Sequence, residues 1–218
     1  MNKKLVITND GSHSFFVPEI NECYHSRHGS IVEAEHVFIK NGLLAEKNNN
    51  LTILEIGFGT GLNALLTAQK AKQNNIYVSY HAIELYPVVK KEYTQLNFAE
   101  LIGIEKESLI LLHESKWEDT CEINNNFELT KNNISAEKYE TNTRFDIIYY
   151  DVFSPEKQPE LWNENIFKKM HHFLKKDGFL VTYCAKGIVR RTLKAVGFEV
   201  ISLDGPPGKR QITRANRK

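Results

Sequence analysis

The stretch from residue 51 to residue 63, Leu-Thr-Ile-Leu-Glu-Ile-Gly-Phe-Gly-Thr-Gly-Leu-Asn, decides the fold. Its first six residues are a compact, mainly apolar run that predicts a buried strand. Gly57, Gly59 and Gly61 follow, and glycine lets the backbone turn tightly and approach a ligand closely. A helix is expected directly afterwards, over residues 60–72. A strand, a glycine-rich turn and a helix in this order predict a ligand-binding α/β unit.

Strands and helices alternate along the rest of the chain. Helices are expected at 60–72, 162–175 and 188–196, and Pro87 suits the first turn of another, where its missing N–H is not needed. Strands are expected at 51–56, 77–84, 109–112, 145–150, 178–184, 198–203 and 211–215. This alternation predicts an α/β fold with an open, mostly parallel, seven-stranded sheet. The Gly205-Pro-Pro-Gly208 turn sends the chain back, so the last strand is expected to be antiparallel.

Two parts of the chain are distinguished by their patterns. Residues 1–50 are expected to form an N-terminal extension packed on the core, with a hairpin around Asp10-Gly11 and a short helix at 31–39. Residues 51–218 are expected to form the main domain. Residues 119–142 are rich in Asn, Glu, Lys and Thr and are interpreted as an insertion loop that holds a small hairpin or helix.

The composition is ordinary for a globular protein, with 218 residues, 41% hydrophobic and 25% charged. The longest apolar stretches are too short to cross a membrane and no apolar signal core follows Met1, so a cytoplasmic protein is expected. Three cysteines lie far apart, which is unlike a disulfide framework. His25 and His28 lack a clear third ligand, so no metal site is expected.

The net charge is only +1, but the segment from Lys186 to Lys218 is strongly basic. Against two acids, Glu199 and Asp204, it carries nine bases: Lys186, Arg190, Arg191, Lys194, Lys209, Arg210, Arg214, Arg217 and Lys218. Such a segment is typical of a surface that binds a polyanion. The alternative is a solvated basic edge without a partner.

Two acids indicate which class of ligand the glycine-rich turn binds. Glu55 precedes the first glycine by two residues, and Glu84 ends the next strand, where a carboxylate can accept hydrogen bonds from ribose hydroxyls. Leu62 stands where a dinucleotide fingerprint has its last glycine. A carboxylate at Glu55 would repel a pyrophosphate but suits a ligand with an ammonium and a sulfonium, such as S-adenosylmethionine (SAM). A nicotinamide site and a turn without ligand are the alternatives. The pattern resembles class I SAM-dependent methyltransferases.

Asp151 follows the most apolar strand, at the sheet edge where α/β folds bind ligands. Its carboxylate can orient an amine and help remove a proton, which an amine must lose before its lone pair can attack a methyl group. Phe153 offers a ring for a planar substrate, and Pro155 stiffens the loop. The alternative is that Asp151 only caps the next turn.

Several segments together resemble one family: Asp10-Gly-Ser12, Glu22 to Gly29, Glu33 to Phe38, Glu55 to Asn63, Asp151 to Pro155, Pro159 to Trp162, Thr182 to Arg191 and Gly205 to Arg210. These motifs are similar to the methyltransferase domain of the MnmC family, the bifunctional tRNA 5-methylaminomethyl-2-thiouridine biosynthesis proteins. The resemblance runs over nearly the whole chain apart from residues 119–142. The combination is specific, although each piece alone is weak.

The resemblance implies methyl transfer from SAM to the amine of 5-aminomethyl-(2-thio)uridine at the wobble position of bacterial tRNA. Because the chain ends where the FAD-dependent domain of the bifunctional proteins would begin, it is expected to be the stand-alone, MnmD-type form. FAD chemistry is therefore not carried over, and the resemblance leaves open whether a separate enzyme makes the aminomethyl precursor. No membrane partner is expected.

The resemblance also assigns residues. The cofactor site comprises Glu55, Gly57, Phe58, Gly59, Thr60, Gly61, Asn63, Glu84 and Asp151, with Asp151 also on the catalytic, amine side. The substrate and tRNA site comprises Tyr24, His25, Arg27, Phe153, Pro155, Lys186, Arg190, Arg191, Lys209 and Arg210. Two other functions stay open. A methyltransferase of small-molecule amines would not need the basic end, and a non-catalytic RNA-binding scaffold would not need Asp151 beside an intact glycine loop.

Overall fold

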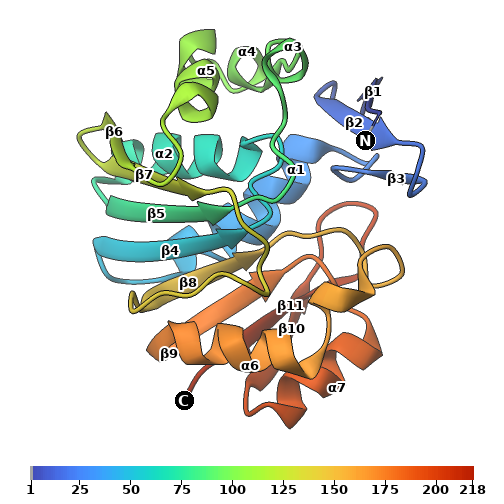
Figure 1. Ribbon diagram of the computed structural model, residues 1–218, viewed down its shortest axis with the longest axis vertical. Coiled ribbons are helices and arrows are strands. Elements are labelled where there is room, and N and C mark those ends of the chain that lie inside the picture. Colours follow the sequence, from blue (N-terminus) through green and yellow to red (C-terminus); the bar gives the residue numbers. More distant parts are fainter. Residues whose placement is uncertain (1) are drawn as a thin grey trace.

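A computed structural model describes residues 2–218 and contains an eight-stranded central sheet in the order β10-β11-β9-β8-β4-β5-β7-β6 (Figure 1). Its parallel strands are β4 (Asn50–Ile56), β5 (Tyr77–Ile83), β7 (Phe127–Asn132), β8 (Phe145–Tyr150) and β9 (Leu174–Thr182). Strand β11 (Gln211–Asn216) runs antiparallel to both β9 and β10 (Glu199–Asp204). The predicted α/β class and the antiparallel last strand are confirmed.

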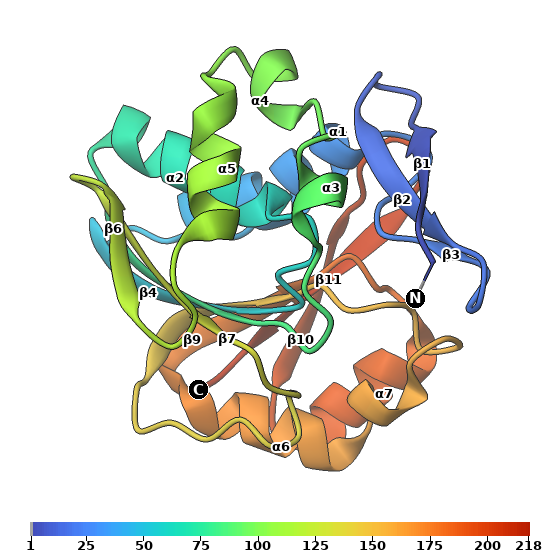
Figure 2. The same cartoon turned by 45° about the horizontal axis from the view of Figure 1, so that its top comes forward.

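Helices cover both faces of this sheet (Figure 2). One face carries α2 (Leu62–Asn74) and α5 (Lys106–Glu114), and the other carries α6 (Glu164–Phe173) and α7 (Gly187–Ala195). Successive residues of a strand point to opposite faces, so Ile53 joins the core under α2 while Leu54 joins the core over α6. Both side chains are fully buried, which explains the continuous apolar run that marks β4 in the sequence.

The N-terminal residues form a separate, antiparallel sheet of β1 (Lys4–Ile7), β2 (His13–Val17) and β3 (Glu22–Cys23). Strands β1 and β2 pair on either side of Asp10-Gly11, where the sequence predicts a hairpin. Helix α1 (Ser30–Ala34) continues as the π-helix η1 (Glu35–Lys40), and a 3-10 turn, η2 (Leu43–Ala45), leads into β4. This part lies beside the carboxyl ends of the central strands (Figure 1).

Two predictions about the middle of the chain are wrong. Residues 109–112 are not a strand but part of helix α5, in which Leu109 and Leu112, three positions apart, face the core. Residues 120–132 do hold a small hairpin, formed by β6 (Thr120–Asn124) and β7, but it extends the central sheet and is not part of an insertion loop. In β7 the buried positions alternate through Phe127, Leu129 and Lys131, so a lysine occupies a core-facing position and hides the strand pattern. The antiparallel edge strand β6 makes the sheet eight-stranded rather than seven-stranded.

Short elements complete the fold. Pro87 lies before the helix that it was expected to begin, since α3 spans Lys90–Tyr93. Helix α4 (Phe98–Leu101) and the 3-10 turn η3 (Pro159–Leu161) follow. Within residues 2–218 no helix is both long and apolar enough to cross a membrane. Over the same residues, no group of three or more His, Cys, Asp or Glu side chains is arranged to hold a metal ion.

Candidate active site

A cavity of about 600 Å³ lies at the carboxyl ends of β4, β5 and β8. These strands deliver Ile56, Ile83 and Asp151 to its wall, and the N-terminal segment around Tyr24 closes it from the other side. The chain proceeds from β4 outward to β5 and β7, then returns to β8 and continues in the opposite direction. The cavity therefore sits where α/β sheets usually bind their ligands, at the switch in strand order.

The glycine-rich turn lines the cavity in a backbone conformation that residues with a Cβ atom would not readily adopt. Gly57 has a φ of +93°, and a Cβ atom added to it would lie 2.4 Å from the backbone oxygen of Asp151. Gly59 has a φ of +49°, and its Cβ atom would approach the Tyr24 ring to 3.3 Å. Gly57 and Gly59 line the cavity, whereas Gly61 sits behind them at the start of α2. The turn thus offers bare backbone to a ligand.

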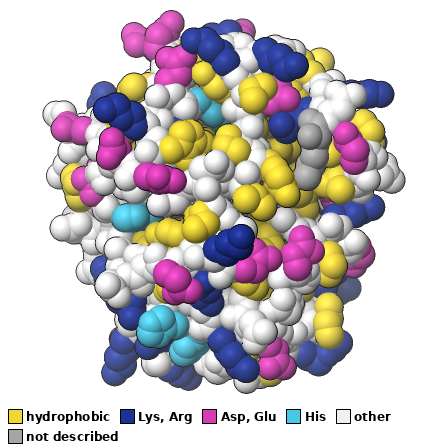
Figure 3. Space-filling view, in the orientation of Figure 1, with side chains coloured by type: hydrophobic (Ala, Val, Ile, Leu, Met, Phe, Trp, Pro, Cys, Tyr) yellow, Lys and Arg dark blue, Asp and Glu magenta, His cyan; other side chains and the backbone are white. Residues whose placement is uncertain are grey.

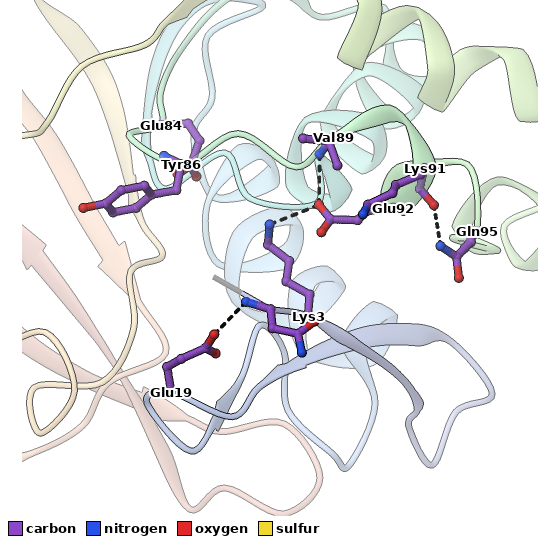
Figure 4. A network of polar contacts seen from close by, with 9 residues as sticks. Lys3, Glu19, Glu84, Tyr86, Val89, Lys91, Glu92 and Gln95 are labelled. Atoms are coloured by element: carbon purple, nitrogen blue, oxygen red, sulfur yellow. Dashed lines mark hydrogen bonds and ion pairs between the residues drawn. The ribbon is translucent and has the colours of Figure 1, made fainter.

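Glu84 is tied to that turn. Its carboxylate accepts hydrogen bonds from the backbone N–H groups of Gly59, over 2.9 Å, and Tyr86, over 2.7 Å. Burial raises the pKa of Glu84. Figure 4 shows Glu84 and Tyr86 together, and beside them the Lys3–Glu92 ion pair of 3.0 Å that fastens the N-terminal strand to the segment after β5. Glu84 lines the cavity, as expected for a ribose-binding carboxylate, but it also holds the turn in place.

Asn63 joins two acids behind the turn. Its side-chain amide donates one hydrogen bond to Glu55 Oε1, over 2.9 Å, and one to Asp151 Oδ2, over 2.8 Å. Glu55 is fully buried and does not line the cavity, so it can reach a ligand only through Asn63. Burial raises the pKa of Glu55 well above its usual value, which favours a neutral acid. Glu55 Oε2 and Asn63 Oδ1 are buried without a hydrogen-bond partner.

Asp151 has the charge properties of a proton acceptor. Burial raises its pKa to about 7, and the negative charge of Glu33 adds to this effect. The hydrogen bond from Asn63 and the positive charge of Lys209 act in the opposite direction. A group whose pKa lies near the working pH is the most efficient general base. Asp151 can therefore exchange a proton with an amine near neutral pH.

Aromatic residues frame the opening of the cavity. Tyr24 and Phe153 meet edge to face, with ring centroids 5.3 Å apart, and both line the cavity. His25 Nε2 lies 2.7 Å from Thr60 Oγ1 and so connects the N-terminal segment to the glycine-rich turn. Burial lowers the pKa of His25 to about 4, so its ring is neutral at physiological pH. Pro155 lies outside the cavity wall.

Three of the basic residues expected at the tRNA site have partners within the chain. Arg190 donates to Thr213 Oγ1, Gln211 Oε1 and the backbone oxygen of Ile212, so its guanidinium holds α7 to β11. Two lysines have acidic partners, Lys186 with Glu156 and Lys209 with Glu33. These three cations are engaged within the chain, and the tRNA contacts expected of them stay a prediction.

Arg191 and Arg210 are exposed, and among residues 2–218 their side chains have no hydrogen bond or ion pair. Arg27 is exposed as well and lines the mouth of the cavity. On the face seen in Figure 3, basic and acidic side chains are interspersed. Of the basic residues predicted to contact tRNA, Arg27, Arg191 and Arg210 therefore keep the freedom to bind an external anion.

Some cavity residues were not anticipated. Ile134, Ser135 and Ala136 come from the segment after β7, and Glu33 and Tyr183 come from α1 and the end of β9. The first three could have been found only by recognising β7, because residues that follow a parallel strand gather at its carboxyl end. Glu33 lies in one of the motifs that resemble the MnmC family, but nothing in its spacing marks it as a cavity residue.

Comparisons with known proteins decide the family. Residues 107–218 match the sequence profile of the S-adenosyl-L-methionine-dependent methyltransferases. The chain belongs to this family. The glycine-rich turn that faces the cavity lies outside the matched residues, so profile and geometry are independent observations.

The methyltransferase is similar to tRNA 5-methylaminomethyl-2-thiouridine biosynthesis bifunctional proteins MnmC. It is 31% identical to the protein of Marinomonas sp. (strain MWYL1), over 89% of this chain and 31% of that protein. It is 29% identical to the protein of Cupriavidus metallidurans, over 96% of this chain and 33% of that protein. The chain thus spans about a third of the length of these curated relatives. The resemblance inferred from the motifs is confirmed.

Solved structures support the fold. MNMC2 from Aquifex aeolicus superposes with a TM-score of 0.82 at 24% identity, over 100% of this chain and 70% of that chain. Spermidine synthase from Thermotoga maritima superposes with a TM-score of 0.55 at 13% identity, over 100% of this chain and 72% of that chain. At these identities the likeness shows the shared fold alone.

The residues present fit SAM, the cofactor of the family. Gly57 and Gly59 expose bare backbone to the cavity at positions where a Cβ atom would meet the Asp151 backbone or the Tyr24 ring, and Glu84 lines the cavity beside them. Behind the turn, Asn63 Oδ1 is a buried acceptor without a partner, as a ligand ammonium group would need. Within residues 2–218, the cavity wall has only two cations, Arg27 and Lys209, so its charge suits a positively charged ligand. The wall has six acids: Glu22, Glu33, Glu84, Glu137, Asp151 and Glu160.

Proposed function

We propose that the methyltransferase transfers the methyl group of SAM to the amine of 5-aminomethyl-(2-thio)uridine at the wobble position of tRNA. The observation that carries the proposal is the position of Asp151, a carboxylate with a pKa near 7 at the end of β8, one hydrogen bond from the cofactor-side residue Asn63. The names of the relatives supply the substrate class. We place this reaction in the cytoplasm.

The residues proposed for the cofactor are those of the turn and its neighbours. Gly57, Phe58, Gly59 and Thr60 would hold SAM along the backbone, and Glu84 would accept hydrogen bonds from the ribose. Gly61, which starts α2, and Glu55, which acts through Asn63, would support this site from behind. When bound, SAM supplies an electrophilic methyl group. The SAM sulfur keeps the electron pair of the sulfur–methyl bond that breaks.

Asp151 would prepare the amine. An alkylammonium has no free lone pair, so it must release a proton before nitrogen can form the new bond to the methyl carbon. The ionised carboxylate of Asp151 accepts a proton from the nitrogen and points the remaining lone pair toward the methyl group. Because Asp151 Oδ2 is held by Asn63, the second oxygen is the one available to the substrate.

The substrate side would admit a single base. Tyr24 and Phe153 provide two aromatic rings at the opening, and a wobble base extruded from the anticodon loop can stack on such rings. His25 fixes this segment against Thr60. Arg27, Arg191 and Arg210 are the cations available to tRNA phosphates, which position a nucleic acid without reading its bases.

The test is methyl transfer itself. Purified protein is incubated with SAM labelled in the methyl group and with tRNA that carries 5-aminomethyl-2-thiouridine, and the digested nucleosides are analysed by mass spectrometry. The label should appear on the side-chain nitrogen of the wobble nucleoside and require Asp151. Free aminomethyluridine nucleoside is the matched small-molecule amine. Labelling of the nucleoside but not of tRNA would replace the proposal with a small-molecule methyltransferase.

A further inference from the structure

The cavity contains an ion pair that the proposed reaction does not use. Lys209, from the turn between β10 and β11, pairs with Glu33 of α1. Their side chains keep only 27% and 13% of their exposure, so the pair is shielded from water. The Lys209 ammonium also lies 4.1 Å from the centroid of the Tyr183 ring. A cation held by a carboxylate and an aromatic face has little freedom to move.

A hydrogen bond connects the surroundings of this pair to the residue after Asp151. Tyr183 donates its hydroxyl hydrogen to the backbone oxygen of Val152, over 2.8 Å, so the ring under Lys209 is fixed to the residue that follows Asp151. Glu33, Tyr183, Lys209 and Asp151 all line the same cavity. The pair is therefore a fixed electrostatic neighbour of the carboxylate that handles the proton.

The other charged groups around Asp151 are mainly acidic, so the cation of this pair differs in sign from its neighbours. Glu55 on β4, Glu84 after β5, Glu22 on β3 and Glu33 on α1 are acidic groups of the elements packed around it. Burial raises the pKa of Glu55 well above its usual value and lowers the pKa of His25 to about 4, so burial disfavours the charged form of both. Besides Lys209, the only cation of the cavity wall within residues 2–218 is Arg27, which is exposed at the mouth. Lys209 is thus the one shielded positive charge of the described wall.

We propose that Lys209 and Glu33 are positioning residues that together set the charge state of Asp151 at working pH. The inference rests on the proposed methyl transfer to an amine, and it gives Lys209 a role inside the cavity instead of the expected phosphate contact. Lys209 favours the ionised carboxylate, and Glu33 limits that effect while holding the lysine in place. Neither residue exchanges a proton with the substrate.

The two halves of the pair act with opposite sign. Without the positive charge of Lys209, the remaining carboxylates favour a protonated Asp151, and its pKa rises. Without the negative charge of Glu33, Lys209 acts uncompensated, and the pKa of Asp151 falls. The loss of one charge in a partly shielded site should move the pKa of Asp151 by on the order of one pH unit. When both charges are removed together, the two shifts of the Asp151 pKa should largely cancel.

The pair also joins α1 to the β10–β11 turn at the cavity wall, so the test variants must keep the shape of this contact. His36 Nε2 lies 2.7 Å from the backbone oxygen of Asp204, and the His28 ring packs against Gly208, so the residues on either side of α1 have further contacts with the end of β10 and the β10–β11 turn. Lys209→Met keeps an unbranched chain on the Tyr183 ring and removes the charge together with the hydrogen bond to Glu33. Glu33→Gln keeps the shape and the polar group. Lys209→Arg keeps the charge and serves as the matched control.

The experiment has two readouts. The first is the pH dependence of kcat for tRNA methylation; the second is the titration of the Asp151 carboxyl carbon by NMR in the free protein. In both, the midpoint should move to higher pH in Lys209→Met and to lower pH in Glu33→Gln. It should return toward the wild-type value in the double variant and in Lys209→Arg, while the affinity for SAM stays unchanged.

The outcomes separate the two claims. If the wild type methylates no tRNA, the proposed function fails, but the NMR titration still decides the inference about the pair. Midpoints that stay in place, or that move in the same direction in both single variants, overturn the inference. A Lys209→Met variant that lowers the salt dependence of tRNA binding and leaves the Asp151 titration unchanged would return Lys209 to a phosphate contact.

Discussion

The side-chain nitrogen of Asn63 lies 2.8 Å from Asp151 Oδ2 and ties the first turn of α2 to the end of β8. The glycine-rich turn is enclosed between these two residues, because Gly57 approaches the backbone oxygen of Asp151 on its other side. The same Asn63 nitrogen donates to the buried Glu55. One amide thus connects the end of the strand before the turn, the helix after it and the proposed proton acceptor.

Replacement of Asn63 by Ala should destabilise the protein and weaken SAM binding. The change leaves the buried Glu55 without a hydrogen-bond donor, and an unsatisfied buried polar group costs about 1–3 kcal/mol. Urea unfolding gives the stability, and calorimetric titration gives the SAM affinity. Asn74→Ala is the control, since Asn74 is exposed at the other end of α2 and bonds only its own helix. Equal effects of the two substitutions would contradict the role of Asn63.

Replacement of Asp151 by Asn should keep SAM binding and lose most methyl transfer. The amide oxygen can still accept the hydrogen bond from Asn63, so the turn keeps its support. The amide cannot accept a proton from the amine, and loss of a general base costs about 10²–10⁴-fold in rate. Single-turnover methylation measures this loss and calorimetry measures the binding. A variant with near wild-type turnover would show that Asp151 is only structural.

The same variant should be more stable than the wild type at alkaline pH. The pKa of Asp151 rises from 3.8 to about 7 on folding, so between these values the folded protein holds a proton that the unfolded chain has released. The free energy of unfolding of the wild type therefore falls as pH rises through this window, by at most ~4 kcal/mol. The side-chain amide of the Asp151→Asn variant does not titrate, so the variant escapes this loss.

Thermal unfolding of both proteins between pH 4 and pH 9 tests the sign. The melting temperatures should coincide near pH 4 and separate above pH 7, with the variant higher. Asp177→Asn, at an exposed carboxylate, is the matched control. A gap that is constant with pH would mean that Asp151 carries no raised pKa.

The sequence predicts the site well where its residues follow one another along the chain. Strand β4, the glycine-rich turn and the start of α2 are contiguous, so their spacing alone indicates a cradle with Glu55 and Asn63 at its ends. Asp151 is found for a similar reason, since it ends a strand that is apolar throughout. Contacts between these segments, such as the bond from Asn63 to Asp151, depend on the folded chain and have no signal in the sequence.

The rest of the fold is hidden by short or mixed patterns. The apolar run at 109–112 is too short to separate a strand from a helix turn. Strand β7 is disguised by the buried Lys131, whose ammonium donates to the backbone oxygen of His113 and lies 4.6 Å from the centroid of the Trp117 ring. Net charge misleads in the same way at the C-terminal end, because it does not reveal that Arg190 and Lys209 have internal partners.

Gly57→Ala should abolish SAM binding, whereas Gly103→Ala should leave it intact. Both glycines have positive φ, +93° and +72°, so alanine at either position costs about 1–2 kcal/mol of backbone strain. Only at Gly57 does the new Cβ atom meet backbone, 2.4 Å from Asp151 O, while at Gly103 nothing lies within 4 Å. Calorimetric titration of both variants with SAM separates the contact from the strain. Similar losses of affinity would assign the requirement at Gly57 to flexibility alone.

The exposed arginines near the cavity should govern the salt dependence of tRNA binding. Arg191 lies on α7, which begins shortly after β9 ends, and Arg210 is the next residue in the chain after Lys209, which lines the cavity. Each phosphate contact releases counterions, so the double variant Arg191→Ala/Arg210→Ala should reduce the slope of log affinity against log salt by about two. Arg190→Ala should instead lower the melting temperature, because its guanidinium holds β11.

Filter binding of tRNA at several salt concentrations measures the slopes. The matched control is Lys72→Ala/Lys176→Ala, which removes two exposed cations from the opposite side of the fold, at the end of α2 and the start of β9. This control should keep the wild-type slope, since charge at a distance from the bound nucleic acid is screened by salt. Equal slopes for both double variants would place the tRNA surface elsewhere, and Arg27 at the mouth of the cavity would then be the next cation to replace.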